Sequence, residues 1–239
     1  ANFNNCTFTG NKTTTSSATS YGGAIMVGAC QDNADAKVMR GNVHALNLNN
    51  CHFENNLVNK TTFTGAIPGG CAVAIHQPAN YEVNVNIDGG VFKNHTAPYV
   101  EGVVLYGASG TLSVKNATFS NNTNVENSGV KATASVLYVK DCNTTIENSH
   151  FDNNKSSGGG TIFLNGQGDF SMVGGSMTNN TSPAGAPAFR VSSNFNSPET
   201  GKKITLKGKT FKTFIPYERI SAAIDEVAAR INADFKGCI

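Results

Sequence analysis

The segment Ile146-Glu147-Asn148-Ser149-His150-Phe151-Asp152-Asn153-Asn154 holds one copy of a pattern that recurs along most of the chain. An apolar residue is followed three positions later by a small residue, two positions after that by Phe, and then by asparagines. In most copies a second apolar residue stands two positions before the first, and this alternation predicts a β-strand. Because asparagine tolerates the left-handed backbone of a tight turn, the pattern predicts strands that alternate with turns.

The copies are aligned by the residue that takes the place of Phe151. Successive anchors lie 26 to 45 residues apart, and they are Phe8, Phe53, Phe92, Phe119, Phe151 and Met177, with Phe211 as a further candidate. Asparagines follow the anchors two or three positions later, among them Asn55, Asn122, Asn154 and Asn180. If neighbouring copies stack, we expect Phe to lie over Phe and the asparagine amides to pair in a ladder.

Short apolar runs opened by small residues stand between the copies, for example Gly22–Val27, Gly69–Ile75 and Gly158–Leu164. Each run fits a strand that is buried on at least one face. A period of this length, with strands and turns but almost no helical pattern, is typical of a β-solenoid whose uneven spacing falls in loops. We therefore expect solenoid coils over residues 1–193.

The combination of small-x-Phe-x-Asn-Asn with Gly22-Gly23-Ala24-Ile25 resembles right-handed parallel β-helix proteins of the pectin-lyase-like type, especially surface-exposed, adhesin-like repeat proteins. The resemblance covers about residues 1–200 and implies an all-β fold, a right-handed parallel β-helix solenoid. It does not fix an activity, because the same fold carries lyases, hydrolases, tailspikes and adhesins.

The end of the chain has a different character. Residues 194–203 are polar and predict a linker, and residues 204–239 predict a short strand followed by one C-terminal α-helix. The helix carries an apolar stripe at helical spacing, made of Ile220, Ile224, Val227 and Ile231. The segment Ile231-Asn232-Ala233-Asp234-Phe235-Lys236-Gly237 is the most specific part of a second resemblance. Residues 203–239 resemble the N-terminal start of bacterial hypoxanthine phosphoribosyltransferases, and they stop before that family's catalytic motifs. Two interpretations stay open, a truncated fusion or a helix that caps the last coil.

Composition excludes several classes of protein. The formal net charge of +2 is too small to indicate nucleic-acid binding, and no apolar run approaches the roughly 20 residues of a membrane span. No signal peptide is visible, and the absence of an initiator Met suggests a fragment or a mature form of an extracellular or cell-surface protein.

The six cysteines match no zinc pattern. Cys6 and Cys51 share one repeat position, where buried thiols and a disulfide are both open interpretations.

Enzymes that cleave polysaccharides on such a fold group carboxylates on one face, and hydrolysis needs two of them. The candidates for this chemistry are Asp88, Glu101, Asp141, Glu147, Asp152 and Asp169, together with Arg190. None recurs at a fixed repeat position, which favours solvated loop acids. Tyr99, Tyr106 and Tyr138 lie near the second strand of the repeat and are candidates for stacking on sugar rings, although packing is the commoner use of such side chains.

The sequence favours a non-catalytic surface or secreted module, adhesin-like or structural, with polysaccharide or cell-surface glycans as its partner. It predicts no cofactor and no metal. The alternative is a polysaccharide lyase or glycoside hydrolase that acts in a groove on the β-helix face. A third interpretation is a fragment of a chimeric phosphoribosyltransferase that is inactive as it stands.

Overall fold

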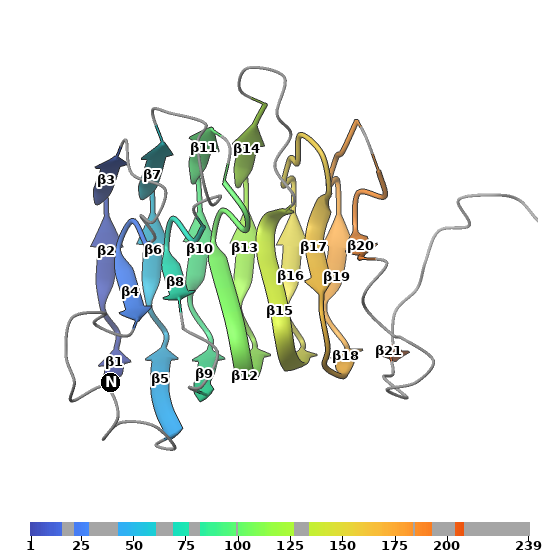
Figure 1. Cartoon of the computed structure of the whole chain (residues 1–239), viewed down its shortest axis with the longest axis horizontal. Helices are drawn as coiled ribbons and strands as arrows, with labels where there is room; N and C mark the ends of the chain where they lie inside the picture. Colours follow the sequence, from blue (N-terminus) through green and yellow to red (C-terminus); the bar gives the residue numbers. More distant parts are fainter. Residues whose placement is uncertain are drawn as a thin grey trace, which may run out of the picture. The chain divides into compact units, whose positions relative to one another are not determined.

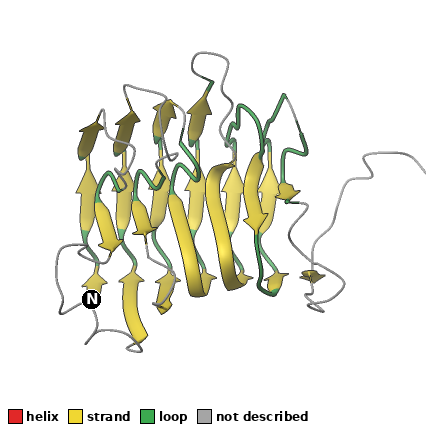
Figure 2. Cartoon of the chain, in the orientation of Figure 1, coloured by secondary structure: helices red, strands yellow, loops and turns green. Residues whose placement is uncertain are grey.

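The computed structural model describes residues 1–15, 22–28, 43–60, 69–76, 82–98, 100–126, 134–183, 185–192 and 204–207. These residues form strands, turns and loops without a helix (Figure 2), so the prediction of an all-β fold is confirmed for them. The chain divides into two compact units, Ala1–Gly208 and Lys209–Ile239. The predicted linker, the anchor candidate Phe211 and the predicted C-terminal helix lie outside the described residues.

The largest sheet, which we call sheet one, has 11 strands. They are β1 (Asn2–Asn4), β4 (Ile25–Gly28), β5 (Val43–Asn49), β8 (Val73–His76), β9 (Glu82–Asp88), β12 (Leu105–Lys115), β15 (Ala134–Glu147), β17 (Gly160–Asn165), β18 (Phe170–Val173), β20 (Phe189–Val191) and β21 (Ile204–Lys207). The long strands β12 and β15 pair with one another along almost their whole length. The C-terminal parts of β12 and β15 lie between β9 and β18 in one row of strands (Figure 1). Their N-terminal parts lie between β8 and β17 in a second row.

Sheet two has six short strands, and each carries one anchor of the repeat at its centre. They are β2 (Thr7–Thr9), β6 (His52–Glu54), β10 (Val91–Lys93), β13 (Thr118–Ser120), β16 (His150–Asp152) and β19 (Ser176–Thr178). Two further pairs are formed by β3 (Lys12–Thr15) with β7 (Leu57–Lys60) and by β11 (Thr96–Pro98) with β14 (Thr123–Val125). Every strand pairing described is parallel.

The aromatic anchors of sheet two lie directly opposite one another in the strand register. Phe8, Phe53, Phe92, Phe119 and Phe151 follow in this order, and Met177 takes the next place. Neighbouring rings are stacked with centroids 4.7 to 4.9 Å apart, which is the spacing of adjacent strands. Complete burial of one such side chain stabilises the fold by roughly 1.5–3 kcal/mol.

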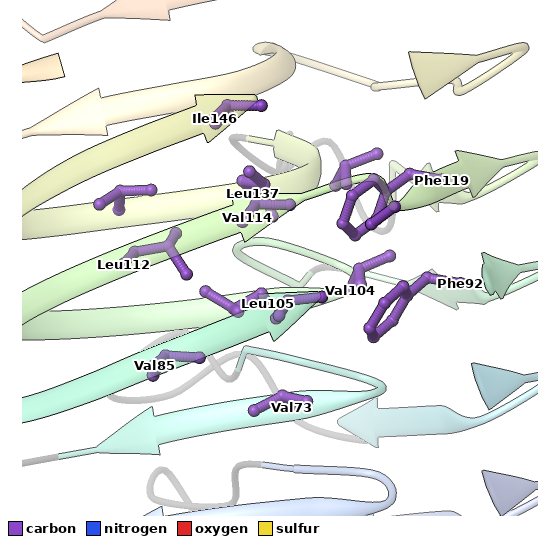
Figure 3. Close-up of a cluster of buried hydrophobic side chains, with 14 of the residues drawn as sticks. Val73, Val85, Phe92, Val104, Leu105, Leu112, Val114, Phe119, Leu137 and Ile146 are labelled. Atoms are coloured by element: carbon purple, nitrogen blue, oxygen red, sulfur yellow. The ribbon is translucent and has the colours of Figure 1, made fainter. Parts of the chain in front are cut away.

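Sheet one supplies the rest of the core through alternate residues of its strands. Figure 3 shows Val85, Leu112, Val114 and Ile146 from sheet one, and the rings of Phe92 and Phe119 that face them. All belong to one buried cluster. The period-two alternation seen in the sequence thus separates the core face of each strand from its polar outer face.

Two positions in each repeat unit adopt a left-handed backbone. The first lies three residues before the anchor and holds Asn5, Asn50, Gly89, Asn116, Asn148 and Gly174. The second lies two residues after the anchor and holds Gly10, Asn55, Asn94, Asn121, Asn153 and Asn179. Every one of them is asparagine or glycine, the residue types that reach this conformation at lowest cost. These positions turn the chain from one strand to the next.

The asparagines three residues after the anchor form the buried ladder. Asn122 Nδ2 donates to Asn154 Oδ1 at 3.0 Å, and Asn154 Nδ2 donates to Asn180 Oδ1 at 2.9 Å. Asn56, rather than the predicted Asn55, is the member in the second unit: Asn11 Nδ2 donates to Asn56 Oδ1 at 2.9 Å. Asn55 is exposed and occupies the left-handed turn position, so its assignment to the ladder is wrong by one residue.

The cysteines at described positions are thiols. Cys6 is half-buried and Cys51 is buried, and neither takes part in a disulfide. The Cys51 Sγ lies 3.4 Å from the carbonyl oxygen of Phe3, the distance of a weak S–H hydrogen bond. Cys71 and Cys142 are also free and buried, and burial raises the pKa of both thiols to about 12. Buried thiols of this kind behave as small apolar side chains.

Candidate functional site

Most of the acidic residues proposed for catalysis are engaged with a neighbour in the adjacent repeat unit. Asp88 Oδ1 accepts a hydrogen bond from Asn116 Nδ2 at 2.9 Å, and Glu147 Oε2 lies 3.2 Å from Lys115 Nζ. Asp152 Oδ1 accepts from the Thr178 hydroxyl and from the Asn179 amide at 2.6 and 3.0 Å.

Two further acids of this set are Asp141, which lies within β15, and Asp169, which directly precedes β18. Asp141 has a left-handed backbone, and its Oδ1 accepts the N–H of Gln167 at 2.8 Å. Asp169 is exposed, and its own N–H donates to Asn143 Oδ1 at 2.9 Å. These contacts tie neighbouring repeat units together, which is a structural role.

Glu101 differs from the other acids in its surroundings. Its backbone forms a parallel bridge with Gly69, and the following residue, Gly102, has a left-handed backbone at φ 61°. A Cβ at position 102 would lie 2.8 Å from Tyr138 Cβ, so only glycine lets this segment approach β15 so closely. The carboxyl-bearing residue is thereby held next to the strand that carries Tyr138.

Tyr138 forms the polar end of this site. Its side chain is only 4% exposed, and its hydroxyl accepts a hydrogen bond from Asn165 Nδ2 at 2.7 Å. The centroid of its ring lies 5.5 Å from the centroid of the Phe163 ring. Lys140, two residues further along β15, is paired in register with Asn165. We call the group Glu101, Tyr138, Lys140 and Asn165 the Glu101 cluster.

The electrostatics of the Glu101 cluster follow from burial. Desolvation raises the pKa of Glu101 to about 7, against a smaller lowering by the positive charge of Lys140. Desolvation also raises the pKa of Tyr138 to about 12, with further increases from the charges of Glu101 and Asp141. At neutral pH the cluster therefore holds a carboxyl that exists in both protonation states, beside a tyrosine that keeps its proton.

Arg190 lies along the same register row, two strands away from Tyr138. Tyr138 pairs with Phe163, and Phe163 pairs with Arg190. The Arg190 guanidinium carbon lies 5.3 Å from the centroid of the Phe163 ring, and Nη1 donates to the carbonyl oxygen of Gly158 at 3.1 Å. The exposed cation is fixed in place by these two contacts.

The structure thus brings together some of the predicted site residues and separates the others. Glu101 and Tyr138 lie in one cluster, within electrostatic reach of Asp141. The role proposed for Tyr138 as a sugar platform is corrected, because its ring is buried against Phe163. The backbone of Tyr106 pairs with Tyr138, and Tyr99 lies outside the described residues. Glu147 and Asp152 lie instead on β15 and β16 in separate contacts with neighbouring units.

The outer face of sheet one carries a continuous polar row, and none of its residues is among the site residues predicted from the sequence. Its members are in register and exposed or half-buried: Asn2, Asn47, Asn86, Ser113, Thr145 and Ser171. Asn47 Nδ2 donates to Asn2 Oδ1 at 2.6 Å, and Asn86 Nδ2 donates to Asn47 Oδ1 at 2.8 Å. We call this set the outer polar row. The alternation of strand residues could have revealed it.

The described residues contain no group of three or more His, Cys, Asp or Glu side chains placed to hold a metal ion. Likewise, no helix with the length and apolar character of a membrane span occurs among them. Comparison of the chain with models of known families, with curated proteins and with solved structures gives no match.

Proposed function

We propose that the repeat units are successive coils of a right-handed parallel β-helix, and that this solenoid is a non-catalytic, adhesin-like or structural module at the cell surface or outside the cell. The observation that carries the proposal is the in-register stacking of equivalent residues from β2 to β19. A stack of this kind is a quasi-one-dimensional scaffold that displays one row of side chains per strand position.

The outer polar row suits a hydroxyl-rich partner such as a polysaccharide or a cell-surface glycan. Amide and hydroxyl side chains are both donors and acceptors, as sugar hydroxyls are. Their spacing repeats at the strand distance of about 4.8 Å, so a long polymer meets several equivalent groups in succession. The contacts of Asp88, Glu147 and Asp152 with their neighbours support a display surface rather than a hydrolytic pair.

Glycan binding by the intact chain tests this proposal. We expect the chain to bind at least one polysaccharide on an immobilised panel without releasing new reducing ends or unsaturated products. The triple variant N47A/N86A/S113A should weaken that binding by about tenfold or more, because several hydrogen bonds of roughly 0.5–1.5 kcal/mol are lost. The matched control T118A/S120A changes the outer face of sheet two and should bind as the unmodified chain does. Equal binding by all three proteins would contradict a role for the outer polar row.

The Glu101 cluster favours a second candidate, cleavage of a polysaccharide by a lyase or a glycoside hydrolase. A carboxyl with a pKa of about 7 is suited to donate a proton at neutral pH. If the chain cleaves a polysaccharide, E101Q should abolish product formation and D152N should retain it. Activity that survives in E101Q would exclude the Glu101 cluster as the catalytic site.

The phosphoribosyltransferase resemblance lies almost wholly outside the described residues, and we propose no transferase activity.

A further inference from the structure

The buried asparagine ladder is interrupted at one position. Three residues after the anchor Phe92 stands His95, whose side chain is completely buried. In the regular pattern each asparagine Oδ1 accepts both the N–H and the Nδ2–H of the asparagine in the preceding unit, as Asn154 does from Asn122 at 3.1 and 3.0 Å. Its Nδ2 then donates to the carbonyl of the preceding anchor, as Asn154 does to Phe119 at 3.1 Å.

His95 reproduces only part of this pattern. Its Nδ1 accepts the N–H of Asn56 at 3.0 Å, and its own N–H donates to Asn122 Oδ1 at 3.2 Å. The other ring nitrogen, Nε2, is buried without a hydrogen-bond partner. Because Nδ1 is an acceptor in this geometry, the proton of the neutral ring is on Nε2, and a buried donor is left unsatisfied.

The charged groups around His95 do not remove the cost of a positive charge there. Burial lowers the pKa of His95 to about 4, and the charge of Glu54 on β6 opposes this only in part. Lys93 Nζ lies 3.5 Å from Glu54 Oε2, and His52 Nε2 lies 2.9 Å from the same oxygen, so Glu54 is already engaged. His52 itself disfavours the charged form of His95. On the other side, the unit of β13 and β14 presents the uncharged Asn122.

We infer that His95 is an acid-sensitive break in the ladder, located between the unit of β6 and β7 and the unit of β10 and β11. Protonation adds a hydrogen to Nδ1, so that two donors, Nδ1–H and the N–H of Asn56, face one another at a distance that holds a hydrogen bond in the neutral form. The contact must open, and it is the side-chain contact of the ladder between these two units. The inference does not depend on the proposed function, because it rests on the ladder alone.

The sign of the pH dependence follows from proton linkage. The contribution of His95 to stability is fully present above the unfolded pKa of about 6.5, and it is lost as the pH falls toward the folded value of about 4. The folded state is therefore less stable relative to the unfolded state at acid pH, because the unfolded state binds the proton more tightly.

The test compares the unmodified chain with H95N in urea unfolding followed by circular dichroism. Asparagine restores the regular ladder and does not titrate. The unfolding constant of the unmodified chain, divided by that of H95N, should rise about 20-fold as the pH falls from 7 to 5. Taking this ratio cancels the titration of other groups. The control H150N replaces an exposed histidine whose Nδ1 contacts Ser176 Oγ at 2.9 Å. The unfolding constant of the unmodified chain, divided by that of H150N, should change much less over the same pH range. A ratio for H95N that stays constant overturns the inference.

Hydrogen exchange of the unmodified chain gives a second measurement that needs no variant. After correction for intrinsic rates, peptides that cover residues 52–60 and 91–98 should lose protection between pH 7 and pH 5. Peptides that cover residues 144–154 and 170–180 should keep theirs, because their ladder contacts are made by asparagines. Equal loss of protection in all four peptides, or no loss in any, contradicts a break at His95.

Discussion

Asparagine performs two different tasks in most of the repeat units, at two neighbouring positions. Two residues after the anchor it provides a left-handed turn, and three residues after the anchor it provides the buried ladder. The first task depends on the backbone alone, since Asn55 is exposed at φ 54° and the equivalent residue of the preceding unit is Gly10. The second depends on the amide group, because only an acceptor and donor on one short side chain completes the pattern.

Substitution of Asn55 separates the turn from the ladder. We expect N55A to lower the free energy of unfolding by roughly 1–2 kcal/mol, because alanine resists the left-handed conformation and lacks the short polar side chain by which asparagine tolerates it. N55G should lie much closer to the unmodified chain, as glycine reaches this conformation freely. Urea unfolding measured by circular dichroism distinguishes the two variants. Equal stability of N55A and N55G would show that the left-handed backbone does not limit this position.

Glu101 gives a prediction of opposite sign to that for His95. Burial raises its folded pKa to about 7, above the usual value of 4.5, so its contribution to stability is present below pH 4.5 and is lost as the pH rises through 7. The variant E101Q carries no charge and should gain stability relative to the unmodified chain as the pH rises from 5 to 8. Unfolding curves at these two pH values measure the difference, and E147Q serves as a control at a half-buried acid paired with Lys115. An unchanged difference between E101Q and the unmodified chain would contradict the raised pKa.

The strands of sheet two show what sequence periodicity can predict. The fixed spacing of an apolar residue, a small residue, the anchor and the asparagines predicted the anchor alignment, and the structure places these anchors opposite one another in register. The long strand β15 was not predicted, because the apolar run Ala134–Val139 and the repeat unit around Ile146 looked like separate elements. Pairing with β12 along both segments joins them into one strand, although Asp141 between them has a left-handed backbone.

The candidate site was less accessible to sequence reasoning than the fold. Glu101 and Tyr138 were both named as candidates, but their proximity depends on the close approach of Gly102 to β15. Burial of Glu101, which sets its pKa, follows from that approach and leaves no pattern in the sequence. His95 was missed because Asn94 beside it satisfied the expected asparagine, although it belongs to the turn position.

Because the rings are stacked, the contribution of each anchor to the free energy of unfolding depends on its place in the stack. Phe119 is fully buried, with stacked rings at 4.9 and 4.8 Å on its two sides. Phe8 is half-buried and has one stacked neighbour, Phe53. We expect F119A to cost about 3–5 kcal/mol of unfolding free energy and F8A about half of that. Urea unfolding monitored by circular dichroism measures both, and a larger loss for F8A than for F119A would contradict the stack.

At the level of the whole described unit, stability is shared among neighbours rather than concentrated in one centre. Each repeat contacts the units before and after it through strand pairing, stacked rings and ladder amides. If the units are stacked coils, as we propose, the stability of the protein approximates a sum of unit and interface terms. The interface that contains the His95 contact is therefore the one whose contribution to stability we expect to depend most on pH.

The proposal that the repeat units are stacked coils is tested most directly by spin-label distances along one register row. Thr9, Glu54, Lys93, Ser120, Asp152 and Thr178 follow one another on the outer face of sheet two. Nitroxides introduced through an unnatural amino acid at Thr9 and Asp152, or at Thr9 and Thr178, leave the native thiols unchanged. Four and five strand steps predict distances of about 19 and 24 Å, with an increment of about 4.8 Å. Broad distributions, or distances that do not increase by one strand spacing, would contradict the coil stack.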